Sequence, residues 1–167
     1  MAHVTLKGNP VSLKGSFLKK GSQAPDFSLV DSDLRDKTLA DYKGKKKLIS
    51  IVPSLDTPTC SLSTKKFNEA AASDPSWVLI VVSCDLPFAQ KRFCSAENTK
   101  NVVTLSMMRS KKFAEDYGVL IQDGPLAGLT ARALVVLDEN NKVLHSELVS
   151  EIAHEPDYKA ALDTLKL

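Results

Sequence analysis

The sequence predicts an α/β fold in which a mixed β-sheet is flanked by helices. The apolar stretch 48–52 predicts a core strand, and the continuous apolar run 77–83 has the length and β-branched content of a strand buried on both faces. Strand patterns alternate with helical patterns through most of the chain, which favours parallel pairing. Two later apolar segments, 133–137 and 143–149, flank the polar turn DENN and predict an antiparallel hairpin. A sheet with both kinds of pairing follows from this order.

Residues 1–16 predict a β-hairpin added ahead of the main fold, because polar and apolar residues alternate on both sides of Gly8, Asn9 and Pro10. The whole chain, 1–167, is expected to form one domain, since 43% hydrophobic content suits one ordinary core. The segment 118–130 is punctuated by glycine and proline and predicts a long loop. Apolar spacing predicts, in chain order, a short strand at 26–30, a helical turn at 37–42, a strand at 48–52, a helix at 60–72, a strand at 77–83, a helix at 88–96, a strand at 101–105, a helix at 111–117, the hairpin at 133–149 and a helix at 157–165. A thioredoxin-like core is the best match to this order.

One cysteine lies where a buried strand meets a helix. In the segment LISIVPSLDTPTC, Pro53 ends the strand ladder, a polar turn follows, and Cys60 falls in the first turn of the expected helix. Functional sites of open α/β sheets lie beyond the carboxyl ends of the strands, where this turn is expected. Cys60 is therefore the candidate nucleophile.

A thiol at this position needs a cation beside it to react at neutral pH. Free cysteine is only a few per cent thiolate at pH 7, and ionising it more fully requires roughly 3 to 4 kcal/mol. A helix N-terminus contributes about 0.3 to 1 kcal/mol, whereas each charge-assisted hydrogen bond adds about 1.5 to 3 kcal/mol. We therefore expect an arginine near Cys60, and Arg132 is the candidate. Arg109 could join the same charge network, although a surface salt bridge is its plainer interpretation.

Pro53, Thr57 and Cys60 form the pattern PxxxTxxC. Thr57 lies three residues before Cys60, so their side chains can converge on one pocket, where a hydroxyl could orient a small polar substrate. The plainer interpretation is that Thr57 only caps the helix and Pro53 only ends the strand. The cysteine that follows them favours the functional interpretation.

The segment PSLDTPTC resembles the active-site motif of the peroxiredoxins. SCDLPFAQKRFC is similar to the segment that carries the second cysteine in their bacterial thiol peroxidase subgroup, which is of the atypical 2-Cys kind. YGVLIQDGPLAGLTARALVVLDENNKV and EIAHEPDYKAAL are similar to later segments of that subgroup, so the resemblance covers essentially the whole chain. It implies a thioredoxin fold and a homodimer.

The resemblance also implies roles for individual residues. Cys60 would be the peroxidatic cysteine, Thr57 and Arg132 its hydrogen-bonding partners, and Cys94 the resolving cysteine of a Cys60–Cys94 disulfide within one chain. Pro53 would shield the pocket from water. The implied activity is antioxidant reduction of hydrogen peroxide and of organic or lipid hydroperoxides, with thioredoxin as the reductant. Because 34 positions separate the two cysteines, we expect local unwinding before the disulfide forms.

Composition excludes several other classes. The net charge is only +2, and the mixed distribution of charges gives no basic face of the kind that phosphate binding needs. Both features argue against nucleic acid as a partner. The first ten residues contain no apolar signal region, and no apolar run approaches the roughly 20 residues that span a bilayer, so we expect a cytoplasmic protein. His3, His145 and His154 are scattered, and neither a metal nor a cofactor is implied. The third cysteine, Cys84, ends a buried strand and is expected to be an inert core thiol.

Two alternatives remain open at this point. A thioredoxin-type disulfide oxidoreductase would be a rival enzyme, but the chain has no CxxC pair, which that chemistry uses. A redox sensor whose disulfide changes its binding partners without turnover would belong to a different class.

Overall fold

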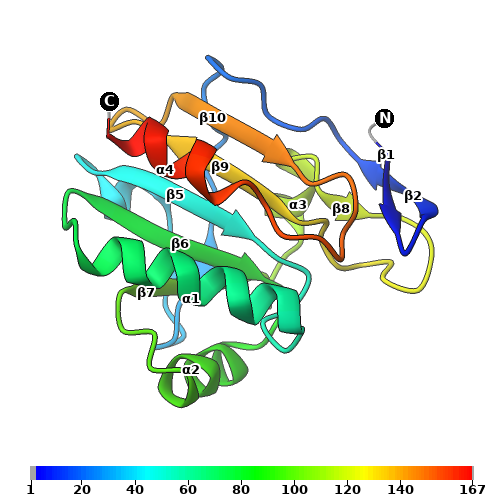
Figure 1. Cartoon of the computed structure of the whole chain (residues 1–167), viewed down its shortest axis with the longest axis horizontal. Helices are drawn as coiled ribbons and strands as arrows, with labels where there is room; N and C mark the ends of the chain where they lie inside the picture. The colour runs from blue at the N-terminus through cyan, green and yellow to red at the C-terminus, as the bar shows by residue number, and fades with distance from the viewer. Residues whose placement is uncertain (1–2, 167) are drawn as a thin grey trace.

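The computed structural model of the chain describes residues 3–166 and contains a seven-stranded mixed sheet in the order β10-β9-β5-β6-β7-β3-β4. Figure 1 labels the first five of these strands, β10 to β7. Strands β5, β6 and β7 are parallel, and the other neighbours pair antiparallel. The strands of this sheet are β3 Leu29–Val30, β4 Asp36–Lys37, β5 Lys46–Ile51, β6 Trp77–Ser83, β7 Val102–Ser106, β9 Ala133–Leu137 and β10 Val143–Leu148. The helices are α1 Pro58–Ala72, α2 Pro87–Ala96, α3 Lys112–Asp116 and α4 Tyr158–Leu165, with a 3-10 turn η1 at Leu39–Tyr42. The predicted α/β class is confirmed.

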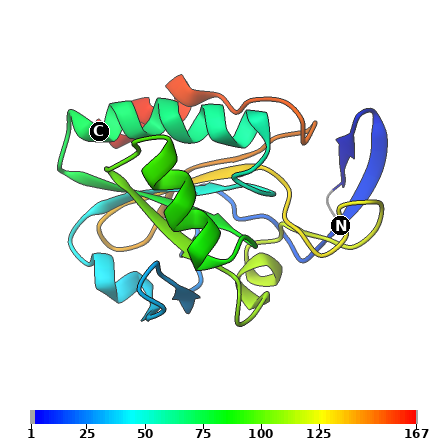
Figure 2. The ribbon, with the colours of Figure 1, turned by 90° about the horizontal axis from the view of Figure 1, so that it is seen from below.

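Alternate side chains of the central strands enter two separate cores, one on each face of the sheet. Leu48 of β5 faces the core that α1 and α4 cover, while its neighbour Ile49 faces the core that α3 and η1 cover. Figure 2 shows the same division, with α1 and α4 on one side of the sheet and α3 on the other. Burial on both faces explains why β6 and the second half of β5 are mostly apolar.

The N-terminal hairpin consists of β1 His3–Leu6 and β2 Asn9–Lys14. Its turn is Lys7–Gly8, with φ angles of 51° and 82°, and not the Gly8–Asn9–Pro10 turn that the sequence predicts. A two-residue turn of this type needs positive φ at both positions, which proline cannot adopt, so Pro10 lies in β2 opposite Thr5. Residues 1–2 of the predicted extension lie outside the described residues.

The segment expected to be one long loop contains the short strand β8, Leu120–Ile121. It pairs with β2 and completes a second, three-stranded sheet, β1-β2-β8. A two-residue strand leaves no periodic pattern in the sequence, so only its distant partner reveals it. The strand predicted at 26–30 is only two residues long in the structure, Leu29–Val30. It pairs with the polar strand β4, which the sequence did not predict.

Candidate active site

Cys60 lies in the first turn of α1, as the sequence predicts. Helix α1 starts at Pro58, after Thr57 at the N-cap, which makes Cys60 its third residue. Proline at the first position suits a helix start, because its missing N–H would have no partner there. The side chain of Cys60 is fully buried, with 0% exposed. The sulfur therefore lies at the positive end of a fifteen-residue helix and away from bulk water.

Arg132 points its guanidinium at this sulfur. Its Nη1 donates a hydrogen bond to Cys60 Sγ over 3.1 Å, and its Nε donates to the carbonyl of Ile152 over 3.0 Å. The pairing of Ile51 with Ala133 explains why Arg132 reaches Cys60. It places Arg132 beside the end of β5, from which the chain turns toward Cys60. Arg132 is itself only 3% exposed, so the contact between cation and sulfur is buried.

Thr57 holds the turn ahead of the helix. Its hydroxyl donates to the carbonyl of Ser54 over 3.0 Å and makes no capping bond to the helix, although Thr57 occupies the N-cap position. Since that hydroxyl hydrogen is engaged, its oxygen can only accept a further hydrogen bond. Pro53 is buried two residues after the end of β5. The structure thus brings three of the predicted residues, Thr57, Cys60 and Arg132, to one end of the sheet.

Cys94 lies on α2, separate from this group, and all three cysteines are free thiols. It packs against the apolar cluster that contains Cys60. Burial raises the pKa of the Cys94 thiol, and the nearby Thr99 hydroxyl offsets this in part. Burial likewise raises the pKa of Cys84, whose sulfur faces the carbonyl of Gly128 at 3.6 Å. Burial therefore favours the protonated form of both thiols.

The sequence did not predict a polar cluster that lies near Arg132. The Tyr158 hydroxyl donates to Glu155 over 2.6 Å, and the Lys66 ammonium lies 3.5 Å from the same carboxylate. The hydrogen bond from Tyr158, with the charges of Lys66 and Arg132, lowers the pKa of Glu155. Both Glu155 and Tyr158 lie in the segment EIAHEPDYKAAL, and their three-residue spacing beside a helix start is the signal that could have suggested the contact.

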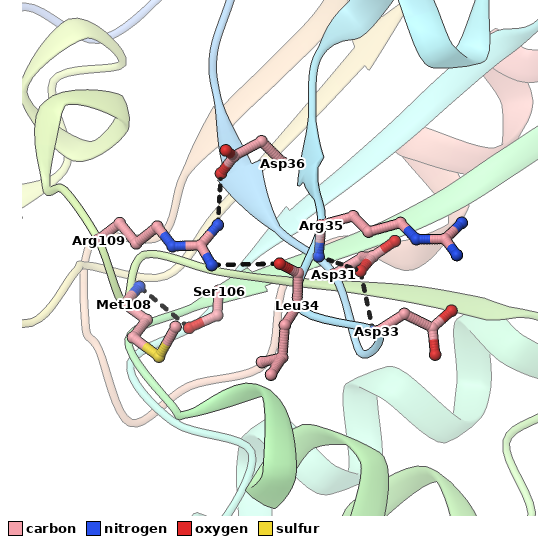
Figure 3. A network of polar contacts seen from close by, with 8 residues as sticks. All are labelled: Asp31, Asp33, Leu34, Arg35, Asp36, Ser106, Met108 and Arg109. Atoms are coloured by element: carbon pink, nitrogen blue, oxygen red, sulfur yellow. Dashed lines mark hydrogen bonds and ion pairs between the residues drawn. The ribbon is translucent and has the colours of Figure 1, made fainter.

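Arg109, the second arginine considered, belongs to a surface network. Its guanidinium donates to Asp36 over 2.8 Å and to the carbonyl of Leu34 over 3.1 Å, and so ties the β3–β4 turn to the chain after β7 (Figure 3). The salt-bridge interpretation is confirmed. Arg109 therefore offers a natural reference for the buried guanidinium of Arg132.

Two absences hold for the described part of the chain. Within residues 3–166, none of the helices combines the length and the hydropathy that a membrane-spanning helix needs. No group of three or more histidine, cysteine, aspartate or glutamate side chains in the same range has the geometry to hold a metal ion.

Comparison with known proteins gives concordant matches. The family described as Redoxin matches residues 19–162. The thiol peroxidase of Staphylococcus aureus (strain MRSA252) is 48% identical over 166 residues, which cover 99% of this chain and 99% of that protein. The crystal structure of a peroxiredoxin-like protein from Aquifex aeolicus superposes with a TM-score of 0.93 at 46% identity, covering 98% of this chain and 95% of that one. The thiol peroxidase from Chromobacterium violaceum gives a TM-score of 0.91 at 30% identity, with the same coverage.

Proposed function

Because the chain belongs to the Redoxin family and is a thiol peroxidase of the peroxiredoxin group, we propose that Cys60 is its peroxidatic cysteine. The observation that carries this assignment is the buried 3.1 Å hydrogen bond from Arg132 to the Cys60 sulfur. A charge-assisted hydrogen bond in a water-poor site favours the thiolate, which is the nucleophilic form. Among residues 3–166, no cation donates a hydrogen bond to Cys84 or Cys94, and burial raises the pKa of both.

The first step is a two-electron displacement. The Cys60 thiolate attacks one oxygen of the peroxide, an S–O bond forms and the O–O bond breaks. The leaving oxygen takes the electron pair and one proton, so it departs as water or an alcohol, and Cys60 becomes a sulfenic acid. Negative charge grows on the leaving oxygen in the transition state, and the guanidinium of Arg132 can stabilise it.

Thr57 and Pro53 orient and shield the reactants. Because the Thr57 hydroxyl donates to Ser54, its oxygen is free to accept the O–H of a protonated peroxide and hold the O–O bond in line with the sulfur. Pro53 is buried beside the turn, where it keeps water out of the pocket. We assign both residues positioning roles, with Thr57 in contact with the substrate.

Cys94 is the proposed resolving cysteine. Its sulfur attacks the Cys60 sulfenic acid, an S–S bond forms, and hydroxide leaves with the thiol proton as water. Both sulfurs lie on helices and a disulfide requires Cα atoms within about 7 Å, so the first turn of α1 and part of α2 must open locally. The resulting intrachain disulfide protects Cys60 from irreversible oxidation.

The substrates that we propose are hydrogen peroxide and organic or lipid hydroperoxides. A surface hollow of about 450 Å³ opens at the start of α1 between Leu62 and His154. Pro58, Leu62 and Ala153 form the apolar part of its lining, and we propose that they contact the organic part of a hydroperoxide.

The proposed cycle closes with thioredoxin, whose two thiols supply the electrons that reduce the Cys60–Cys94 disulfide. The family resemblance supports this reductant, and it also supports a homodimer, a cytoplasmic location and a role in antioxidant defence. We further propose that the hairpin extension and the main fold form one domain, since Val4 and Val11 share an apolar cluster with Ile152.

Peptide mapping under non-reducing conditions tests the cycle. After one equivalent of hydrogen peroxide, the wild-type protein should yield a Cys60–Cys94 linked peptide pair, and Cys60→Ser should consume no peroxide. Equal peroxide-driven thiol loss in both proteins would refute the assignment of Cys60. Repeated turnover with thioredoxin, its reductase and NADPH distinguishes a peroxidase from a sensor that is oxidised once.

A further inference from the structure

Asp85 hydrogen-bonds to the turn that leads to Cys60. This residue lies between the end of β6 and the start of α2. Its Oδ1 accepts a hydrogen bond from the Ser54 hydroxyl at 2.7 Å, and its Oδ2 accepts one from the backbone N–H of Leu55 at 2.8 Å. Ser54 is also the residue whose carbonyl accepts the Thr57 hydroxyl. One carboxylate therefore holds the turn from which Thr57 and Cys60 are positioned.

The same carboxylate is linked to the helix that carries Cys94. Oδ2 of Asp85 accepts a hydrogen bond from the Ser83 hydroxyl at 2.7 Å, and the Ser83 oxygen accepts one from the Gln90 side-chain amide at 3.1 Å. Gln90 is fully buried in α2, one helical turn before Cys94. The Ser106 hydroxyl donates a hydrogen bond to the Asp85 carbonyl over 2.5 Å, which holds the Asp85 backbone in place. The polar chain runs from the turn before α1 into the body of α2.

We propose that Asp85 is a positioning residue that couples the turn at 53–57, which leads into the first turn of α1, to helix α2. The first turn of α1 and part of α2 then open together when the disulfide forms. This inference rests on the proposed function of Cys60 and Cys94. While the hydrogen bonds persist, the turn is ordered and the peroxide step is fast. Since the disulfide step needs both segments to open, the same hydrogen bonds slow it. Asp85 thus favours the reaction of Cys60 with peroxide and slows the formation of the disulfide.

The variant Asp85→Ala should move the two steps in opposite directions. Loss of the carboxylate should slow the second-order oxidation of Cys60 by about tenfold and speed the unimolecular formation of the disulfide by about tenfold, the size that loss of one or two net hydrogen bonds gives. Rapid-quench mass spectrometry after mixing with hydrogen peroxide measures both rates, because sulfenic acid and disulfide differ in mass. Faster disulfide formation should also protect Cys60 from overoxidation at high peroxide.

A conservative variant should restore the wild-type rates. In Asp85→Asn the amide oxygen can still accept from Leu55, and its NH₂ group can donate to the Ser54 oxygen, so both rates should return to within about threefold of wild type. Ser54→Ala removes the hydrogen bond to Asp85 and the longer one, of 3.2 Å, that the Ser54 oxygen accepts from the backbone N–H of Asp56. It should slow the peroxide step and speed disulfide formation, each by about threefold. This variant also decides the matter if Asp85→Ala does not fold.

Asp123→Ala is the matched control. In wild type Asp123 accepts a backbone N–H and a hydroxyl from Ser12 at 2.9 and 2.8 Å, as Asp85 does from its donors, but it lies beside β8, in neither mobile segment. The Asp123→Ala variant should lower the Tm and leave unchanged the rates of Cys60 oxidation and of disulfide formation. Parallel changes of the two rates in Asp85→Ala and Ser54→Ala, or no change in either, would overturn the coupling. Absence of the Cys60–Cys94 disulfide in wild type would instead overturn the proposed function.

Discussion

The guanidinium of Arg132 joins the Cys60 sulfur, at 3.1 Å, to the carbonyl of Ile152, at 3.0 Å. Two separate N–H groups of one planar fork make these contacts, so the position of the charge relative to the sulfur is fixed by the backbone of a different segment. A lysine has a single flexible ammonium and cannot make both contacts in this geometry.

Arg132→Lys should slow the oxidation of Cys60 by hydrogen peroxide about tenfold to a hundredfold, because a charge-assisted hydrogen bond of about 1.5 to 3 kcal/mol is lost or misdirected. Competition with a peroxidase of known rate measures the second-order constant. Arg109→Lys is the matched control, since it alters a surface guanidinium bonded to Asp36 and should leave the rate unchanged. An unaltered rate in Arg132→Lys would remove Arg132 from the site.

Thr57→Val should lower the same rate constant by about tenfold, because it removes the hydrogen bond to Ser54 and the oxygen that accepts from the peroxide. Thr57→Ser keeps the hydroxyl and should stay within about threefold of wild type. If both variants reacted equally fast, the side chain would serve only the shape of the turn.

Cys94→Ser should leave the first oxidation of Cys60 intact and abolish the intrachain disulfide, so that sulfenic acid accumulates and turnover with thioredoxin is lost. Cys84→Ser removes the other half-buried thiol and should form the disulfide normally. Mass spectrometry of the trapped sulfenic acid gives the readout. A Cys60–Cys84 linked peptide in wild type would contradict the assignment of Cys94.

Glu151 should make the hairpin contact sensitive to acid. Its carboxylate accepts hydrogen bonds from the backbone N–H groups of Ala153 and Gly8, which hold the pKa of Glu151 at about 2, below its ordinary 4.5. Because the folded-state pKa is depressed, this contribution to stability is complete above pH 4.5 and is lost as the pH falls from 4.5 toward 2.

Glu151→Gln should therefore lower the Tm by a few degrees at pH 7, and this difference from wild type should shrink at pH 3. Thermal unfolding followed by circular dichroism at the two pH values tests this. Glu69→Gln, at an exposed position of α1, is the control and should behave as wild type at both. A Tm difference of the same size at pH 3 would mean that the carboxylate charge is not what anchors the hairpin.

The long strands and helices were predictable because each one is encoded by its own run of residues. Strands β5 and β6 follow from the apolar stretches 48–52 and 77–83, and α1 follows from Pro53 and the polar turn, although it begins at Pro58, two residues before the predicted start. Strands β4 and β8 were not predictable, since two residues carry no period. Their hydrogen bonds depend on partners that are distant in sequence.

The candidate site divides in the same way. Cys60 and its helix start could be inferred from one segment, whereas Arg132, 72 positions away, was inferred from the chemistry that a reactive thiol needs. The cluster of Glu155, Tyr158 and Lys66 and the hydrogen bonds of Asp85 were not foreseen, because they join segments that no local pattern relates.

The sequence by itself determined which residue could be a nucleophile and on which kind of element it lies, because proline, apolar runs and helix caps act over a few neighbouring residues. Only the tertiary structure decided which groups surround that sulfur. The antiparallel pairing of Ile51 with Ala133 delivers Arg132 to Cys60, and a register shift of one residue would turn that guanidinium to the opposite face of the sheet. Such contacts depend on packing across the whole core, which no single stretch of the chain encodes.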